Sequence, residues 1–269
     1  CAGWRRVVSG TGSQKTSKNI VVASFRAPSS VIEIKTINIP NDLQRLKYRR
    51  IQQRAMTSPR ILIGCPTYDG MKYCLDDWAK AVHLLSYKNV SVVLADNSET
   101  DGYKKDLESK GFRVIRVPRE TDPLDTITTA RNRLRELALK EGFDFFLSLE
   151  QDVLPPTDVI ERLLKWDIPI ISGVYCTYIV KDGKSAKVPL LWTWVKEEEF
   201  DQILRNAQDY PETYARIKDK KPEDLKRQLR IEELYTEDLF EVKYAGLGCM
   251  LIRRDVLEKV SFKRSTGHM

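Results

Sequence analysis

The sequence lacks the features of a secreted, disulfide-bonded or membrane-spanning protein. It has no run of eighteen apolar residues, so no transmembrane helix is expected. Its first residues are polar and basic and show no signal peptide. The 5 cysteines are scattered and form no C-x-x-C pair, which argues against a disulfide framework and against a zinc site. We therefore expect reduced thiols and a cytoplasmic protein, peripheral to a membrane at most.

Acidic residues are scarce at the start of the chain. Residues 1–60 hold 12 Lys and Arg against 2 Asp and Glu, whereas residues 61–269 hold 33 against 36. The basic pI of about 9.0 therefore belongs to an N-terminal arm, predicted over 1–58 as a β-hairpin and a basic helix. Within the arm, residues 41–56 can contact an anionic membrane or another anionic partner. The catalytic domain is expected over 59–269, with a charged helical insertion near 195–234.

From residue 60 onwards, short apolar runs alternate with helical patterns. Strands are expected at 61–65, 90–95, 112–117, 143–149, 168–174 and 241–252. Helices are expected at 70–87, 103–109, 126–140, 157–166 and 255–260. This alternation predicts an α/β fold with a mostly parallel central sheet covered by helices.

Polar residues follow three of the expected strands. They are Pro66, Thr67 and Tyr68, then Asp96, Asn97 and Ser98, then Glu150 and Asp152. The carboxyl ends of parallel strands share one edge, where open α/β sheets bind their ligands. Tyr68 is suited to stacking on a base, and Asp96 to accepting a hydrogen bond from a base or ribose. Glu150 and Asp152 lie two residues apart and supply the hard oxygen ligands that Mg²⁺ or Mn²⁺ takes when it carries a diphosphate.

With these motifs in place, the sequence resembles the GT-A fold glycosyltransferases, especially the large inverting family 2. More loosely, it is similar to fungal Golgi mannosyltransferases and to glycosyltransferases of archaeal viruses and phages. The resemblance covers roughly 60–262 and includes a Pro-Thr-Tyr turn, an Asp-Asn-Ser loop, an Ala-Arg-Asn helix segment (130–132), an Asp-x-Asp-like motif (150–152) and a Gly-Leu-Gly strand (246–248). The fold that it implies is the Rossmann-like nucleotide-diphospho-sugar transferase sheet.

The resemblance implies a metal-dependent, inverting transfer of a sugar from a nucleotide-diphosphate sugar to a hydroxyl of a glycan, lipid or protein. Arg131 and Asn132 would contact the nucleotide or the transferred group. Because Glu150 stands where the family has Asp, Asp152 is expected to be the firmer metal ligand, with Glu150 acting on the ribose or through water. Glu237 and Asp238 are the candidates for the catalytic base, although they precede the Gly-Leu-Gly strand instead of following it.

Two other functions are compatible with parts of the sequence. A sugar-phosphate nucleotidyltransferase uses a related sheet but needs a glycine-rich loop directly after its first strand, and residues 65–68 do not form one. A non-enzymatic protein that binds nucleic acid or membrane would act through the basic arm.

Overall fold

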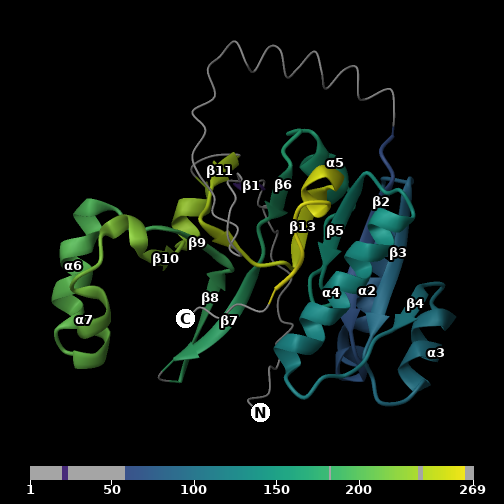
Figure 1. Cartoon of the computed structure of the whole chain (residues 1–269), viewed down its shortest axis with the longest axis horizontal. Coiled ribbons are helices and arrows are strands. Elements are labelled where there is room, and N and C mark those ends of the chain that lie inside the picture. Colours follow the sequence, from purple (N-terminus) through teal and green to yellow (C-terminus); the bar gives the residue numbers. More distant parts are fainter. Residues whose placement is uncertain (1–19, 24–57, 182, 236–238, 264–269) are drawn as a thin grey trace, which may run out of the picture.

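A mixed eight-stranded sheet organises the part of the chain that the structure describes (Figure 1). The computed structural model describes residues 20–23, 58–181, 183–235 and 239–263. The strands of this sheet lie in the order β11-β1-β6-β13-β5-β2-β3-β4. Their bounds are β1 Ile20–Ala23, β2 Ile61–Thr67, β3 Val90–Asp96, β4 Arg113–Arg116, β5 Phe145–Leu149, β6 Ile170–Gly173, β11 Leu239–Glu241 and β13 Cys249–Arg253. The α/β class expected from the sequence is confirmed.

The sheet is parallel on the side that carries the three polar strand ends. Strands β5, β2, β3 and β4 are parallel neighbours, and β1 pairs parallel with β11. Strand β13 runs antiparallel to both β5 and β6, and β1 runs antiparallel to β6. The last strand in sequence therefore occupies a central place in the sheet, which the alternation of elements along the chain does not reveal.

Alternation of side chains along the central strands builds a core on each face. In β2, Ile61, Ile63 and Cys65 point to one face, whereas Leu62 points to the other. The first face is covered by α2 Leu75–His83, α3 Gly102–Ser109 and α5 Val159–Leu164. The second is covered by α4 Pro123–Lys140 and α8 Arg254–Leu257. Burial on both faces explains why β2 and β5 read as continuous apolar runs.

Helix boundaries differ from the expected ones where local chemistry intervenes. Helix α4 begins at Pro123 because the Asp122 carboxylate accepts a hydrogen bond from the Leu124 amide, and proline needs no partner in the first turn. The segment after β2 opens as a 3₁₀ helix, η1 Asp69–Cys74, before α2 follows. Apolar spacing alone indicates neither boundary.

The region near 195–234 is more than a helical insertion. It contains α6 Glu197–Ala207, α7 Pro211–Ile217, η2 Pro222–Asp224 and η3 Ile231–Tyr235. It also contributes β10 Lys226–Gln228 to a small sheet with β9 Leu191–Trp194 and β12 Tyr244–Ala245. The strand expected over 241–252 is therefore divided between β11, β12 and β13. A separate β-hairpin precedes this region and consists of β7 Cys176–Lys181 and β8 Lys184–Pro189.

Little of the predicted basic arm is described. Residues 20–23 form β1 within the main sheet, between β6 and β11. The rest of the predicted hairpin and the basic helix, including 41–56, lie outside the described residues. Within the described residues, no helix combines the length and apolar character needed to cross a membrane.

Candidate active site

The three polar strand ends meet at the carboxyl edge of the parallel strands. Thr67 and Asp96 are direct partners in the β2–β3 register, and the Asn97 amide donates to the Thr67 carbonyl at 3.0 Å. The Thr67 hydroxyl donates to the Gln151 side chain, which ties the end of β2 to the turn that follows β5. Residues far apart in sequence are thus in direct contact, because the carboxyl ends of the parallel strands share one edge of the sheet.

Gln151, the middle residue of the acidic motif, is the buried centre of this junction. Its side chain is 1% exposed, and its Nε2 donates to the Tyr103 hydroxyl of α3 at 2.7 Å. Burial of that hydroxyl raises the pKa of Tyr103 to about 12, so it stays protonated. The sequence gives no signal for Tyr103, and its signal for Gln151 is an uncharged, hydrogen-bonding residue between two carboxylates at a strand end.

Glu150 is held by Arg131, which reaches across from α4. Arg131 Nη2 donates to Glu150 Oε1 at 2.5 Å, and the Glu150 amide donates to the Gly248 carbonyl at 2.9 Å. Burial raises the pKa of Glu150 above its ordinary value, the charge of Arg131 opposes that rise, and the charge of Asp152 adds to it. Arg131 Nε is buried and has no hydrogen-bond partner among the described residues.

Asp152 is the exposed member of the pair. It lies close enough for its charge to act on Glu150 and on the buried thiol of Cys65. Burial, more than either carboxylate, raises the pKa of that thiol well above its ordinary value, so Cys65 is a core residue and no nucleophile. Tyr68, at the end of β2, is 40% exposed, and its ring lies so close to Gly70 that a Cβ there would overlap it.

Asp96 is placed at the expected edge but is fully engaged by the protein. It has no exposed surface, and one carboxylate oxygen accepts from the Ser98 amide at 2.9 Å and the Ser98 hydroxyl at 2.5 Å. The other accepts from Arg116 at 2.5 Å, and Arg116 also donates to the Ser98 carbonyl. These hydrogen bonds hold the 96–98 loop in place, and the expected contact of Asp96 with a base or ribose stays a prediction. Arg116 was missed because only the register of β3 with β4 places it opposite Asp96.

Arg131 and Asn132 are neighbours in sequence, but their side chains contact different parts of the protein. Asn132 Nδ2 donates to the Phe262 carbonyl at 2.9 Å, and its Oδ1 accepts from the Phe262 amide at 2.9 Å. Successive helical residues point about 100° apart, since a turn holds about 3.6 residues. Arg131 therefore faces the strand ends, while the Asn132 amide fixes the segment after α8. Glu237 and Asp238 lie outside the described residues, and their role as base candidates stays a prediction.

Tyr175 lies beside Glu150 and packs against Gly246 and Gly248, and the sequence did not indicate this position. Its hydroxyl accepts a hydrogen bond from the Gly248 amide at 2.8 Å, and a Cβ at Gly246 or Gly248 would collide with its ring. The two glycines are therefore required by the close approach of the tyrosine. Burial, followed by the charge of Glu150, raises the pKa of Tyr175, which places its neutral hydroxyl near that carboxylate.

The donor set fits a divalent cation that brings its own phosphate ligands. Among the described residues, no group of three or more His, Cys, Asp or Glu side chains is arranged to enclose a metal ion. Mg²⁺ sites that bind substrate phosphates commonly use only one or two protein carboxylates. Asp152 would supply one exposed carboxylate to such an ion, and Glu150 would supply a second if it were released from Arg131.

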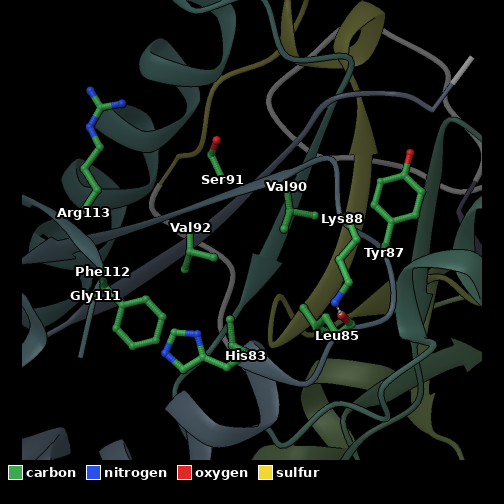
Figure 2. A pocket seen from close by; sticks show the side chains of 11 residues that line it. His83, Leu85, Tyr87, Lys88, Val90, Ser91, Val92, Gly111, Phe112 and Arg113 are labelled. Carbon is green, nitrogen blue, oxygen red and sulfur yellow. Dashed lines mark hydrogen bonds between the residues drawn. The ribbon is translucent and has the colours of Figure 1, made fainter.

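A hollow of about 430 Å³ lies at the opposite end of the parallel strands, where β3 and β4 begin (Figure 2). The His83 ring stacks on Phe112 there, with a centroid distance of 5.0 Å. Lys88 donates to the Leu85 carbonyl at 2.8 Å, and Arg113 forms a bidentate pair with Glu141. Its cations already have partners and its lining contains no carboxylate, so this hollow does not compete with the strand-end site.

Comparison with known proteins identifies only distant structural neighbours. No family model matches the chain, and no curated protein matches it. Structures of GT-A glycosyltransferases do match. The mannosyltransferase PcManGT from Pyrobaculum calidifontis, solved with GDP-Man and Mn²⁺, matches with a TM-score of 0.32 and 15% identity over 60% of this chain and 46% of its own.

Two further structures match at a similar distance. TarS 1-349 from S. aureus, solved with UDP-GlcNAc, gives a TM-score of 0.28 at 16% identity over 38% of this chain and 29% of its own. Glucosyl-3-phosphoglycerate synthase from Mycobacterium tuberculosis, solved with Mn²⁺, UDP and glucosyl-3-phosphoglycerate, gives 0.35 at 12% identity over 82% of this chain and 64% of its own. The chain spans less than two thirds of each of these three proteins. Likeness at this level does not establish an activity, a substrate or a metal for this chain.

Proposed function

We propose that the chain is a metal-dependent glycosyltransferase, which moves a sugar from a nucleotide-diphosphate sugar to an acceptor hydroxyl. The observation that carries the proposal is the junction of the three strand ends through Thr67, Asn97 and Gln151. It gives a single edge that combines two carboxylates, one cation and an exposed tyrosine. A nucleoside diphosphate with a divalent cation presents the complementary groups: an aromatic base, a polyanion and a hard cation.

The proposed roles follow the burial of each group. Asp152, as the exposed carboxylate, binds Mn²⁺ or Mg²⁺ together with the donor diphosphate, and Glu150 is the second carboxylate of that site. The bound ion would neutralise charge on the leaving diphosphate. Arg131 pairs with Glu150 beside the carboxylates, so its guanidinium is suited to donate to a phosphate oxygen. Tyr68 stacks on the base, and Asp96 acts by keeping the 96–98 loop in shape for it.

Transfer to an acceptor also requires a base that removes the proton of the attacking hydroxyl. Glu237 and Asp238 are the proposed candidates. The configuration of the product, expected to be inverted, is part of the same proposal. An acceptor would enter beside Tyr175 and the Gly246–Gly248 turn, because these residues line the site on the side of Glu150 opposite to the nucleotide-binding loops.

Thermal unfolding with nucleoside diphosphates tests the proposal. Wild-type protein should be stabilised by one nucleoside diphosphate in the presence of Mn²⁺, and much less by either component alone. Asp152→Asn should abolish the Mn²⁺-dependent shift and leave the unfolding temperature of the free protein unchanged. Asp209→Asn, an exposed acid in the insertion, is the matched control. If no diphosphate stabilises the wild type, or if Asp152→Asn responds as the wild type does, the proposal is wrong.

A further inference from the structure

The β7–β8 ribbon, residues 176–189, is exposed in its outer part, at 178–180 and 183–187. It forms a separate two-stranded sheet and pairs with no other strand of the described residues. Figure 1 shows it standing away from the main sheet, on the side where the parallel strands end. A two-stranded hairpin alone is marginally stable in water, so a ribbon of this kind gains from a surface that covers it.

Three consecutive apolar side chains near the tip of the ribbon are open to solvent. Tyr178 is 56%, Ile179 is 42% and Val180 is 73% exposed. Alternation along the strand sends Tyr178 and Val180 to one face and Ile179 to the other. A contiguous apolar group of this kind on a protein surface marks an interaction site more often than a single exposed residue does.

Basic residues outnumber acidic ones in the ribbon. Its sequence holds three lysines, Lys181, Lys184 and Lys187, against one acid, Asp182. Lys184 and Lys187 are exposed, and Lys187 lies directly opposite Tyr178 in the strand register. Apolar side chains flanked by lysines match a surface that is apolar inside and anionic at its boundary. We propose that this ribbon binds an anionic lipid surface.

Two other occupants fit these features less well. A second copy of the ribbon would bring lysines against lysines, and charged edge strands disfavour pairing between chains. A nucleic acid would use the lysines, but Ile179 and Val180 offer neither a ring for base stacking nor a hydrogen bond. A bilayer uses all three features, because aliphatic groups enter the acyl boundary, tyrosine settles at the headgroups and lysines attract anionic lipids.

Docking through the ribbon would turn the carboxyl edge of the sheet towards the bilayer. An acceptor carried by a lipid would then reach the Tyr175 side of the site without leaving the membrane. This consequence depends on the glycosyltransferase proposal, whereas lipid binding by the ribbon does not. The two are measured separately, by vesicle binding and by nucleotide binding, so the failure of one is distinguishable from the failure of the other.

Flotation of the full chain with vesicles tests the inference. Wild-type protein should float with vesicles of phosphatidylcholine and phosphatidylglycerol, and far less with phosphatidylcholine alone. Substituting both Tyr178→Ser and Val180→Ser should weaken binding about tenfold or more, because two apolar side chains no longer enter the membrane. Reversing Lys184→Glu and Lys187→Glu should also weaken it at least about tenfold, since each lysine near an anionic surface contributes roughly a fivefold factor.

Controls come from exposed residues in and around α7. Tyr210→Ser removes an aromatic ring that is 66% exposed, and Lys218→Glu with Lys220→Glu reverses two exposed lysines. These variants should bind vesicles as the wild type does. The lysine reversals keep the test valid if the serine variant unfolds, because they leave the apolar packing unchanged.

Three results would overturn the inference. In the first, the wild type fails to bind anionic vesicles. In the second, the wild type and both ribbon variants bind them equally well, which assigns the contact to another part of the chain. In the third, the ribbon variants keep their vesicle binding but lose self-association in ultracentrifugation or lose affinity for a single-stranded RNA oligonucleotide.

Discussion

Arg131 and Glu150 form an ion pair of 2.5 Å between α4 and the end of β5, beside the exposed Asp152. In the proposed site, the Arg131 guanidinium and a metal ion compete for the Glu150 carboxylate. The protein alone therefore presents one available carboxylate, and the second becomes available when Arg131 moves to another anion. A donor diphosphate supplies that anion, which would make metal and donor bind together.

The first prediction follows from this competition. Arg131→Gln should raise the affinity of the protein alone for Mn²⁺ by about tenfold, equivalent to about 1.4 kcal/mol, because Glu150 is released. Electron paramagnetic resonance of free Mn²⁺ during a titration measures it. Arg133→Gln, an exposed arginine of the same helix that pairs with Glu136, is the control. Equal Mn²⁺ affinity in the wild type and Arg131→Gln would show that the ion pair does not limit metal binding.

A second prediction concerns the buried amide of Gln151. Gln151→Leu removes the partner of the Thr67 hydroxyl and of the Tyr103 hydroxyl, and both lie in the interior. Leaving buried polar groups unsatisfied should lower the free energy of unfolding by about 2–3 kcal/mol. Urea denaturation measures the change, and Gln202→Leu on the exposed side of α6 should cause little. A loss no greater than that of Gln202→Leu would contradict the junction role.

The clamp on Asp96 gives a third prediction. Arg116→Met should destabilise the protein by about 3–5 kcal/mol, since it leaves a fully buried carboxylate without its cation. Adding Asp96→Asn should recover part of that loss, because the buried charge is removed as well. Arg119→Met, at an exposed arginine 3.5 Å from Glu99, serves as the control. If the double variant is as unstable as Arg116→Met alone, unpaired charge is not the cause.

The insertion has a pH-dependent contact in Glu233. Hydrogen bonds from Arg227 lower the pKa of Glu233 from its ordinary value of 4.5 to about 2. A carboxyl group with a lowered pKa in the folded state stabilises the protein above pH 4.5, and that stability is lost as the pH falls from 4.5 towards 2. With solvent screening, we expect about 1 kcal/mol at neutral pH.

Glu233→Gln should therefore lower stability at neutral pH and flatten the decline between those two pH values. Unfolding by urea at several pH values checks this. The neighbouring Glu232→Gln removes an exposed carboxyl group and should leave the curve unchanged. Identical pH profiles for Glu233→Gln and the wild type would rule out this contribution.

The sequence predicted that three polar turns lie together at one edge of the sheet, because that placement follows from local patterns. Each polar turn directly follows an apolar run, and parallel strands bring such turns to one edge. The partners of those turns were not predictable. Arg116 follows Asp96 by twenty positions, and Tyr103 belongs to a helix on one face of the sheet, so both depend on strand register and helix packing.

The surroundings of Asn132 show the same limit. The helix turns its amide towards the backbone of Phe262, 130 positions away, which the sequence does not indicate. The contact of Arg131 and Asn132 with a nucleotide or a transferred group stays a prediction. The division of the 241–252 segment into three strands has a similar origin. Its apolar residues are continuous in sequence, and only the neighbouring β9, β1 and β5 decide which of them pair.

The position of β13 has a consequence for the order of folding. Strands β5 and β6 have no direct contact in the sheet order and are joined only by β13, which begins about a hundred residues after β5 ends. During synthesis, the ribosome must release residue 253 before these two strands gain their common neighbour. Until then both carry an open edge that invites pairing with other chains. Completion of this sheet is therefore a late and non-local event, and slow refolding at low protein concentration should favour it.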